Sequence, residues 1–550
     1  MRQLRHTGFI LAAVVVVGAC RAPPRTERAP VDIDEDRYRD QLTTLASPEF
    51  QGRRPGTAGE DRTVAYIAEQ FRRLKLKPLS GDSYLQPVPL IDYTPVGQPA
   101  LSVTGAAGPQ ALSFPADMVI WSRREDPVVN LQASGVVFAS FGVSAPELGR
   151  DDYAGVDVRG RTVVVISGEP GAAGGAVARA GAHQAGFYAR PGYKVAEAAR
   201  HGASGLLILH TPLAAGRSWA EIVAEAGGVL ADRAPDAAGP ARLAIEGWLS
   251  ADAGRTLFAA AGVDYAATLA AAAGSGFHAL ALAARVDAEI HHISRRFTSS
   301  NVIGVLQGSR HRDEYLAYSA HWDSFGLQPG SAGSQLYPGA VDNASGVAGL
   351  LQLARVFTRS RVAPGRSIIF MALTGGEANL AGSAWYVDHP AYPLADTVAD
   401  LNLDTLHIGG PTRDVTVFGL GQSELDGYVR SSATLQGREV HAEEDPRGGT
   451  FYASDSFSFA SHGVPSLYAI GGDDDAARGP GWGRDVRRDY LLNRHHRPAD
   501  GVDPDWNLRG TVDDLRLYYR VGNSLAQGGG FPNWTRNSEF REAGAQDRGN

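Results

Sequence analysis

The segment that most limits the fold of this chain runs from Asn301 to Ile470, where short apolar stretches alternate with a helical pattern. Residues 367–373 (S-I-I-F-M-A-L) are almost all apolar, as expected for a strand buried on both faces of a parallel sheet. Residues 347–357 instead place apolar side chains at helical spacing. This alternation predicts an α/β domain in which helices flank a central, mostly parallel sheet.

Polar residues stand where several of these stretches end. His321 follows the apolar residues 315–320, Glu377 comes shortly after residues 367–373, and Asp404 ends L-N-L-D. Because the carboxyl ends of parallel strands gather at one edge of a sheet, we expect these three side chains to lie close together. Two further candidates are Asp342, which opens D-N-A-S-G before the helical pattern, and His496, within H-H-R-P-A-D.

These five residues are of the types that bind metal ions. Imidazole and carboxylate groups suit zinc, and a shared carboxylate can hold two ions about 3.5–4 Å apart. Asp342 is the expected bridge because it opens a tight turn before a helix. Asp323 is expected to accept a hydrogen bond from the imidazole of His321 and so fix its tautomer. Other divalent ions remain open for the same ligands.

With these motifs the chain resembles the dizinc aminopeptidase and carboxypeptidase family, which includes bacterial leucyl aminopeptidases, glutamate carboxypeptidase II and the transferrin receptor ectodomain. The resemblance extends from Asp34 to Gln527. The N-terminal S-P-E-F-Q-G-R-R-P-G-T-A-G resembles a loop of that family, and H-H-R-P-A-D with the later W-N-L-R-G resembles its closing histidine motif. The resemblance implies the phosphorylase/hydrolase-like fold of zinc exopeptidases.

The resemblance also implies a role for each candidate. Asp342 would bridge two zinc ions, His321 and Asp404 would complete one site, and Glu377 and His496 would complete the other. The peptide bond between Asp342 and Asn343 would be cis. In the implied reaction, a glutamate takes a proton from water that attacks a peptide carbonyl and returns the proton to the leaving amine.

The chain departs from this family at the general base. The family has two consecutive glutamates where this chain has Gly376 and Glu377, so the first carboxylate is missing. Loss of a general base typically costs about 10²–10⁴-fold in rate. Glu443, Glu444 and Asp445 are candidate replacements, although the sequence does not place them at the metals. The variant Gly376→Glu would restore the missing side chain.

A β-rich module interrupts the peptidase-like sequence. Residues 135–142, 161–167 and 205–210 resemble short strands, and residues 195–201 resemble a helix. The module resembles a protease-associated domain. We expect it to span residues 119–284, between the peptidase-like segments 34–118 and 285–530, with a C-terminal tail at 531–550.

The N-terminus has the pattern of a lipoprotein signal. Arg2 and Arg5 precede an apolar run, residues 8–17, which ends in V-G-A-C at Cys20, the single cysteine of the chain. Residues 1–20 are therefore expected to be a signal peptide, Cys20 a lipidated residue and residues 21–33 a tether. The residue after the cysteine, Arg21, favours the outer membrane by resemblance. A plain secretory signal with a chance cysteine remains the alternative.

Composition narrows the class of protein. Hydrophobic residues make up 43% and charged residues 20% of the 550, as in a soluble globular protein. The formal net charge of −8 gives no basic surface for nucleic acid. One cysteine permits no intrachain disulfide. We expect His495 to be a surface residue and the acidic run 473–475 to be a solvated loop.

The sequence therefore predicts a zinc-dependent exopeptidase of the cell envelope, most simply an aminopeptidase that removes N-terminal residues from peptides. The missing general base leaves open a catalytically inactive relative that binds peptides. Glutaminyl cyclisation, which needs one metal, is the third alternative. The ligand set favours two metals over one.

Overall fold

The computed structural model describes residues 33–146, 149–170, 186–211, 218–226, 228–235, 242–274, 276–330, 333–528 and 530–544. The predicted signal peptide, Cys20 and all of the tether but its last residue lie outside these ranges. Among the described residues, no helix is both long enough and apolar enough to cross a membrane.

The predicted α/β domain is built on a mixed sheet whose centre is parallel. Its strands follow one another in the order β11 (Leu230–Arg233), β2 (Leu85–Pro95), β13 (Leu280–Leu306), β17 (Arg366–Leu373), β14 (His311–His321), β18 (Thr397–Asn402), β21 (Ser466–Gly471), β19 (Asp414–Phe418) and β20 (Glu439–Ala442). The strands β17, β14, β18 and β21 run parallel, and antiparallel pairs flank them. Strand β1 (Lys77–Pro78) pairs with the end of β13. The expected fold class is thereby confirmed.

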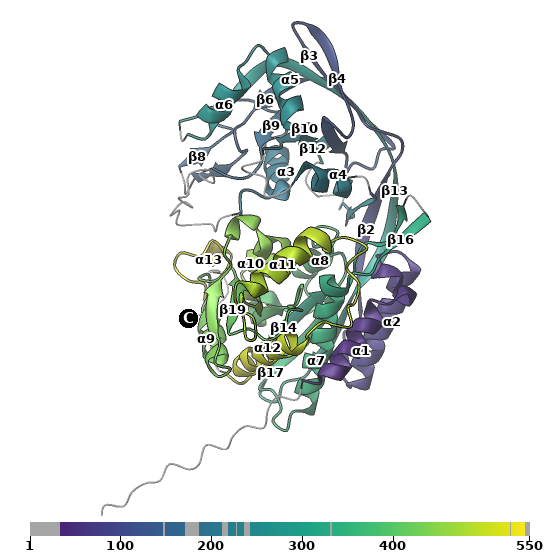
Figure 1. Cartoon of the computed structure of the whole chain (residues 1–550), viewed down its shortest axis with the longest axis vertical. Helices are drawn as coiled ribbons and strands as arrows, with labels where there is room; N and C mark the ends of the chain where they lie inside the picture. Colours follow the sequence, from purple (N-terminus) through teal and green to yellow (C-terminus); the bar gives the residue numbers. More distant parts are fainter. Residues whose placement is uncertain are drawn as a thin grey trace, which may run out of the picture. The chain divides into compact units, whose positions relative to one another are not determined.

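Helices pack around this sheet as Figure 1 shows. They are α1 (Glu35–Leu45), α2 (Ala58–Arg73), α7 (Ser345–Arg359), α8 (Ala381–Asp388), α9 (Leu425–Thr434), α10 (Ser456–Ser461), α11 (Trp482–Asn493), α12 (Arg509–Gln527) and the short α13 (Arg541–Gly544). All eight residues of β17 are buried, which explains its apolar sequence. Helix α7 packs against α1 and against β14, so nearly all of its side chains are buried.

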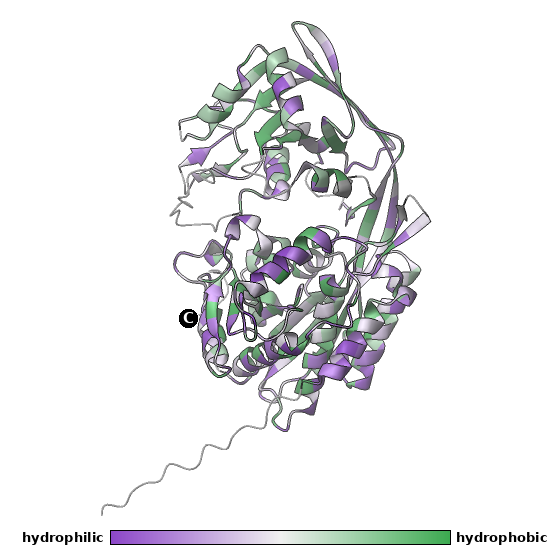
Figure 2. Ribbon diagram, viewed as in Figure 1, coloured by the Kyte–Doolittle hydropathy of each residue, from purple (hydrophilic) through white to green (hydrophobic). Residues whose placement is uncertain are grey.

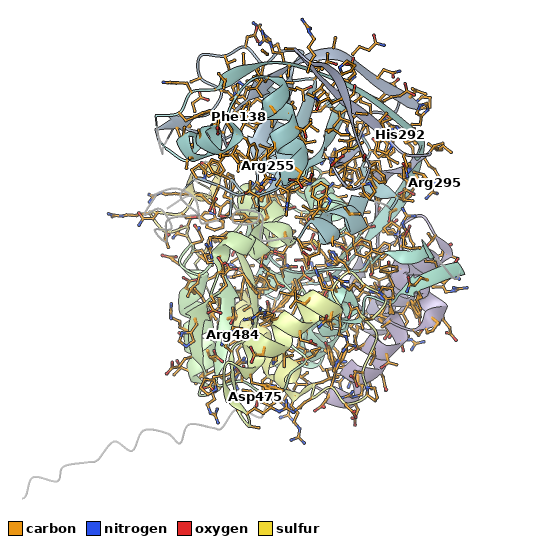
Figure 3. All side chains as sticks on the ribbon, turned by 45° about the horizontal axis from the view of Figure 1, so that its top comes forward. Phe138, Arg255, His292, Arg295, Asp475 and Arg484 are labelled. Atoms are coloured by element: carbon orange, nitrogen blue, oxygen red, sulfur yellow. The ribbon has the colours of Figure 1, made fainter. Side chains whose placement is uncertain are left out.

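The inserted module forms a second sheet. Its strands are β3 (Ala100–Gly105), β4 (Gly108–Leu112), β5 (Met118–Trp121), β6 (Val128–Phe138), β9 (Thr162–Ile166), β10 (Gly205–Leu209), β12 (Ile245–Leu249) and the first part of β13. Helices α3 (Pro191–Arg200), α4 (Trp219–Ala226), α5 (Ala251–Ala260) and α6 (Tyr265–Ala272) accompany it. Phe138, labelled in Figure 3, packs edge-on against Phe258 in its core. Figure 2 colours β9 and β10 as hydrophobic.

Short elements complete the described chain. Three pairs of short strands are β7 (Ser144–Ala145) with β8 (Arg150–Asp151), β15 (Gly326–Gly330) with β16 (Gly333–Tyr337), and β22 (Asp474–Asp475) with β23 (Gly479–Pro480). The short helices are η1 (Pro48–Arg53), η4 (Ala340–Ala344), η5 (Leu394–Asp396), η6 (Pro446–Gly448) and η7 (Thr450–Ala453). Of these, η1 contributes Arg53 and η4 contributes Asp342 to the candidate metal centre.

The module begins earlier than the sequence predicts. The hairpin β3–β4 pairs with β13 in the module's sheet, so the expected boundary at residue 119 falls within that sheet. Strand β13 is continuous from Leu280 to Leu306 and pairs in both sheets. The boundary is hidden in the sequence because one unbroken strand serves both sheets.

The predicted tail is packed in its first part. Trp534 is 8% and Phe540 4% exposed, and Trp534 Nε1 donates a hydrogen bond to the carbonyl of Gly463 at 3.0 Å. The segment 531–550, which we expected to be a tail outside the peptidase-like domain, therefore packs against that domain in its first part. The two aromatic side chains outweigh the polar residues around them, because their burial stabilises docking.

Candidate metal centre

Three of the predicted ligands meet in a buried group. His321 ends β14, Asp404 lies just past β18, and Asp342 lies in η4 at the start of α7. The Nε2 of His321 is 3.1 Å from Asp342 Oδ1 and 3.6 Å from Asp404 Oδ1. We call these three residues the buried half, since none of their side chains is more than 12% exposed. The peptide bond Asp342–Asn343 is cis, as the family resemblance implies.

The other two predicted ligands meet on the opposite oxygen of the same aspartate. His496 Nε2 is 3.2 Å from Asp342 Oδ2 and 3.2 Å from Glu377 Oε2. The His496 side chain is 32% exposed, so we call Asp342, Glu377 and His496 the open half. All five predicted residues thus come together, and the two oxygens of Asp342 face the two imidazoles.

His495, which we expected at the surface, also reaches this group. Its Nε2 lies 3.2 Å from Asp342 Oδ2, and its ring stacks on that of His496 with centroids 3.7 Å apart. The side chain is 30% exposed, so it is neither buried nor a free surface residue. The sequence signal that could have found it is the doubled histidine itself.

The donor atoms of the group fit a cation. Among the described residues, no hydrogen-bond partner reaches Glu377 Oε1 or Asp404 Oδ1, although both atoms are buried. Unpaired buried carboxylate oxygens are costly unless a cation or a hydrogen bond satisfies them. Three carboxylates and two or three imidazoles are the ligands that zinc prefers. The residues present therefore fit a zinc centre.

Imidazole and carboxylate groups lie close together in this group, and each shifts the pKa of the other. Burial opposes the charged imidazolium of His321, but Asp323, Asp342 and Asp404 outweigh it and raise its pKa well above the usual range. For His496, burial is likewise outweighed by Glu377 and Asp342, and the pKa is raised. Burial raises the pKa of Glu377, whereas the histidines hold that of Asp342 well below its usual range despite burial.

Asp323 positions the site differently from the expectation. Its Oδ1 lies 3.5 Å from His321 Nδ1, beyond the usual length of a hydrogen bond. The same carboxylate accepts hydrogen bonds from the backbone N–H of Gly376 at 2.8 Å and of Glu377 at 3.2 Å. Asp323 therefore fixes the turn after β17, from which Glu377 points at His496.

Gly376 lies directly against the ring of His321. A Cβ added at Gly376 would be 2.3 Å from His321 Cγ and 2.5 Å from its Nδ1, which is closer than atoms can approach. The space that a side chain would occupy at position 376 is thus filled by a predicted metal ligand. In the same turn, Asn379 adopts a φ of 57°, a conformation that asparagine tolerates.

The three candidate replacements for the general base make their contacts elsewhere. Glu444 approaches Arg484 at 3.5 Å, Asp445 pairs with Arg447 at 2.7 Å, and burial raises the pKa of Glu443 to about 7 beside the backbone of Gly419. None of these contacts involves a residue of the metal group. The described contacts therefore give no support for these three carboxylates as replacements.

Arg53 supports the site from the N-terminal loop, and the sequence did not single it out. Its fully buried guanidinium donates hydrogen bonds to the carbonyls of Trp322, Leu45, Pro338 and Gly339 at 2.6–2.8 Å. The carbonyls of Trp322, Pro338 and Gly339 lie beside His321 and just before η4, and that of Leu45 lies at the end of α1. Burial lowers the pKa of Arg53 to about 10, and the surrounding carboxylates oppose that shift. Arg53 therefore ties together the two segments that carry the buried half.

Asp500 fixes the bridging residue from the closing motif. Its carboxylate accepts hydrogen bonds from the backbone N–H of Val341 at 3.0 Å and of Asp342 at 3.1 Å. Burial raises the pKa of Asp500 to about 6. The acidic run 473–475 is not the solvated loop that we expected, because Asp475 (Figure 3) is buried and caps a turn. Asp473 pairs with Arg487, and Asp474 pairs with Arg413.

The comparisons with known proteins agree with this geometry. Residues 301–519 match the profile of Peptidase family M28. A "Probable zinc metalloprotease" of Pyrenophora teres f. teres is 36% identical over 109 residues, 19% of this chain and 22% of that protein. Aminopeptidase YwaD of Bacillus subtilis is 28% identical over 213 residues, 38% of this chain and 40% of that protein. The chain thus spans less than half the length of these curated relatives.

A solved structure extends the likeness to nearly the whole chain. The aminopeptidase from Aneurinibacillus sp. strain AM-1 superimposes with a TM-score of 0.51, covers 90% of this chain and 95% of its own, and is 18% identical. This likeness establishes the fold. It does not identify the inserted module, whose resemblance to a protease-associated domain stays a prediction.

Proposed function

We propose that this chain, whose residues 301–519 form a domain of Peptidase family M28, is a zinc-dependent exopeptidase that removes N-terminal residues from peptides. The observation that carries the proposal is the position of Asp342, whose two oxygens face His321 on one side and His496 on the other. Relatives named as a zinc metalloprotease and an aminopeptidase support the metal and the reaction. When bound, zinc would polarise the substrate carbonyl.

The chain's own residues divide the remaining work. The exposed edges of His495 and His496 mark the side from which a peptide can approach. Asp323 and Asp500 hold Glu377 and Asp342 in place through backbone N–H groups. Gly376 offers no side chain to accept a proton, so we expect turnover to be slower than in an enzyme that holds a general base, by about 10²–10⁴-fold.

The experiment uses the mature chain with and without zinc. We expect the purified protein to hold two zinc ions, to hydrolyse aminoacyl anilides and to leave N-acetylated anilides untouched. Dialysis against a chelator should abolish hydrolysis, and added zinc should restore it. A protein that holds no zinc after zinc loading contradicts the proposal, as does hydrolysis that survives complete removal of metal.

Gly376 favours a second candidate, a peptide-binding protein without turnover on the same scaffold. Its signature would be two bound zinc ions and measurable peptide affinity with no hydrolysis, even at high enzyme concentration. Calorimetric titration with unblocked and N-acetylated peptides separates the two functions. Turnover of the unblocked peptide during the titration excludes the binding-only function.

The same proposal places the protein on the cell envelope. The pattern V-G-A-C at Cys20 supports lipidation at that residue and anchorage, with the outer membrane as the expected location. Expression with labelled fatty acid should label the wild type but not the Cys20→Ser variant, and only the wild type should sediment with membranes. Label on the variant contradicts lipidation at Cys20.

A further inference from the structure

Two adjacent histidines face the same carboxylate oxygen. The Nε2 atoms of His495 and His496 are each 3.2 Å from Asp342 Oδ2. Their rings stack with an interplanar angle of 26°. Together with Asp342 they present three ligand atoms that all lie within 4.8 Å of one another, which is compact enough for a single ion.

The backbone explains how neighbouring side chains come to point the same way. Helix α11 ends at Asn493, and the N–H of His495 donates a hydrogen bond to the carbonyl of Tyr490 at 2.9 Å. His496 then adopts a φ of 56°, in the left-handed region that is uncommon for residues other than glycine. Strain of this kind, of order 1–3 kcal/mol, persists where the surroundings impose it and is concentrated at functional sites.

Aromatic neighbours hold both rings in this orientation. The ring of Phe325 packs against His496 at 4.7 Å, and that of Tyr490 against His495 at 5.7 Å. The stacked pair therefore lies between two aromatic side chains with both Nε2 atoms turned towards Asp342. A surface histidine without a ligand role would not need aromatic rings packed against this pair.

We propose that His495 is a ligand of the zinc ion in the open half, beside Asp342, Glu377 and His496. The inference rests on the proposed function, because it assumes that zinc occupies the group. The open half would then offer four protein ligands and the buried half three. Closed four-ligand zinc sites are structural, whereas three-ligand sites keep a position for water or substrate. The ion of the buried half would accordingly be the one with the open position.

A purely packing role for His495 predicts different behaviour. If His495 only supports the ring of His496, a phenyl ring in its place would preserve the stack and the metal. If His495 supplies a nitrogen ligand, the phenyl ring would preserve the stack and weaken the metal. The variant His495→Phe therefore separates the two roles, and His495→Ala removes both.

The test measures zinc rather than hydrolysis. Wild type, His495→Phe, His495→Ala and the control His441→Ala, an exposed histidine beside Glu439, are loaded with zinc and titrated against a chromophoric chelator. We expect the wild type and the control to bind two ions alike. His495→Phe and His495→Ala should bind one ion about as the wild type does and the other roughly 100-fold more weakly. Thermal unfolding of the metal-free forms verifies that each variant folds.

Cobalt substitution gives an independent readout. The visible absorption of Co²⁺ reports the number and type of ligands, so His495→Phe should change the spectrum of one bound ion. Two ions bound by His495→Phe with wild-type affinity and an unchanged spectrum would overturn the inference and leave the proposed function intact. A wild type that binds no zinc would instead overturn the proposed function.

Discussion

The two halves of the metal centre share Asp342 but are built in opposite ways. His321 and Asp404 of the buried half are 6% and 12% exposed and stand at the ends of neighbouring parallel strands. His496 of the open half is 32% exposed and stands in the chain after α11. The buried half is held by the sheet, whereas the open half is held by a loop and its aromatic neighbours.

This difference assigns different work to the two halves. Residues at strand ends are positioned by a hydrogen-bonded ladder, and Arg53 adds four hydrogen bonds behind them. A loop can move more readily than a strand end, so under the proposed function we expect a peptide to approach from the side of the open half. Five predictions test this contrast, from the largest expected effect to the smallest.

Asp342→Ala removes the one residue that both halves share. We expect loss of both zinc ions and of all hydrolysis, because each imidazole loses its facing carboxylate oxygen. Metal analysis after zinc loading measures the effect, and Asp252→Ala, at an 86% exposed side chain, is the matched control. One tightly held ion in Asp342→Ala would show that a half can stand alone and that Asp342 is not a bridge.

Gly376→Ala should weaken zinc binding in the buried half alone. The added Cβ would lie 2.3 Å from His321 Cγ, so the imidazole must move away from Asp342 and Asp404. Zinc content should fall from two ions to about one. Gly427→Ala is the control, since a Cβ there meets no atom within 4 Å. Two ions in Gly376→Ala would mean that the turn after β17 can yield.

The close contact between Gly376 and His321 also affects any attempt to restore the general base by substitution. From the sequence alone, Gly376→Glu would return the missing carboxylate. In the structure it would first displace His321, so we expect that variant to lose zinc rather than to gain activity. Restoration would need a compensating shift of the turn that Asp323 holds.

Sequence patterns predicted the fold and the buried half well for a physical reason. The apolar residues 367–373 are typical of a strand buried on both faces, and polar residues that follow parallel strands gather at one edge of the sheet. Four of the five predicted ligands could be placed together from the sequence pattern, because they follow strands or begin a helix. His496 was found by motif resemblance alone.

The remaining features depend on tertiary packing that no local pattern encodes. Arg53 matters through carbonyls of residues up to 286 positions away. His495 reaches Asp342 Oδ2 across 153 positions of the sequence. The module boundary was missed because β13 runs unbroken through two sheets, and the tail because two aromatic residues outweigh its polar composition.

Metal binding should release protons from both halves. In the metal-free protein, carboxylates raise the pKa of His321 and of His496 well above the usual range despite burial. Both imidazoles are therefore protonated at pH 7 and must lose a proton to bind zinc. We expect about one proton released per imidazole, and affinity that falls about tenfold per released proton for each unit by which pH is lowered.

Calorimetry in two buffers of different ionisation enthalpy counts these protons. Wild type should release about two protons at pH 7, and Asp342→Ala, which binds no zinc, should release none. Release from one half only would show that the other histidine is already neutral. That result would separate the halves electrostatically as well as structurally.

Tyr490→Phe should give the smallest effect and should touch the open half alone. The Tyr490 hydroxyl lies 3.3 Å from Asp500 Oδ2, and the Tyr490 ring packs on His495 at 5.7 Å. The variant loses one long hydrogen bond and keeps the ring, so the affinity for one zinc ion should fall by about tenfold at most. This is the lower end of the roughly 10–100-fold loss of metal affinity that is typical when a partner of a metal ligand is substituted. Chelator titration should leave the tighter ion unchanged. Equal weakening of both ions would mean that Asp500 transmits the change through Asp342, and that the two halves respond as one unit.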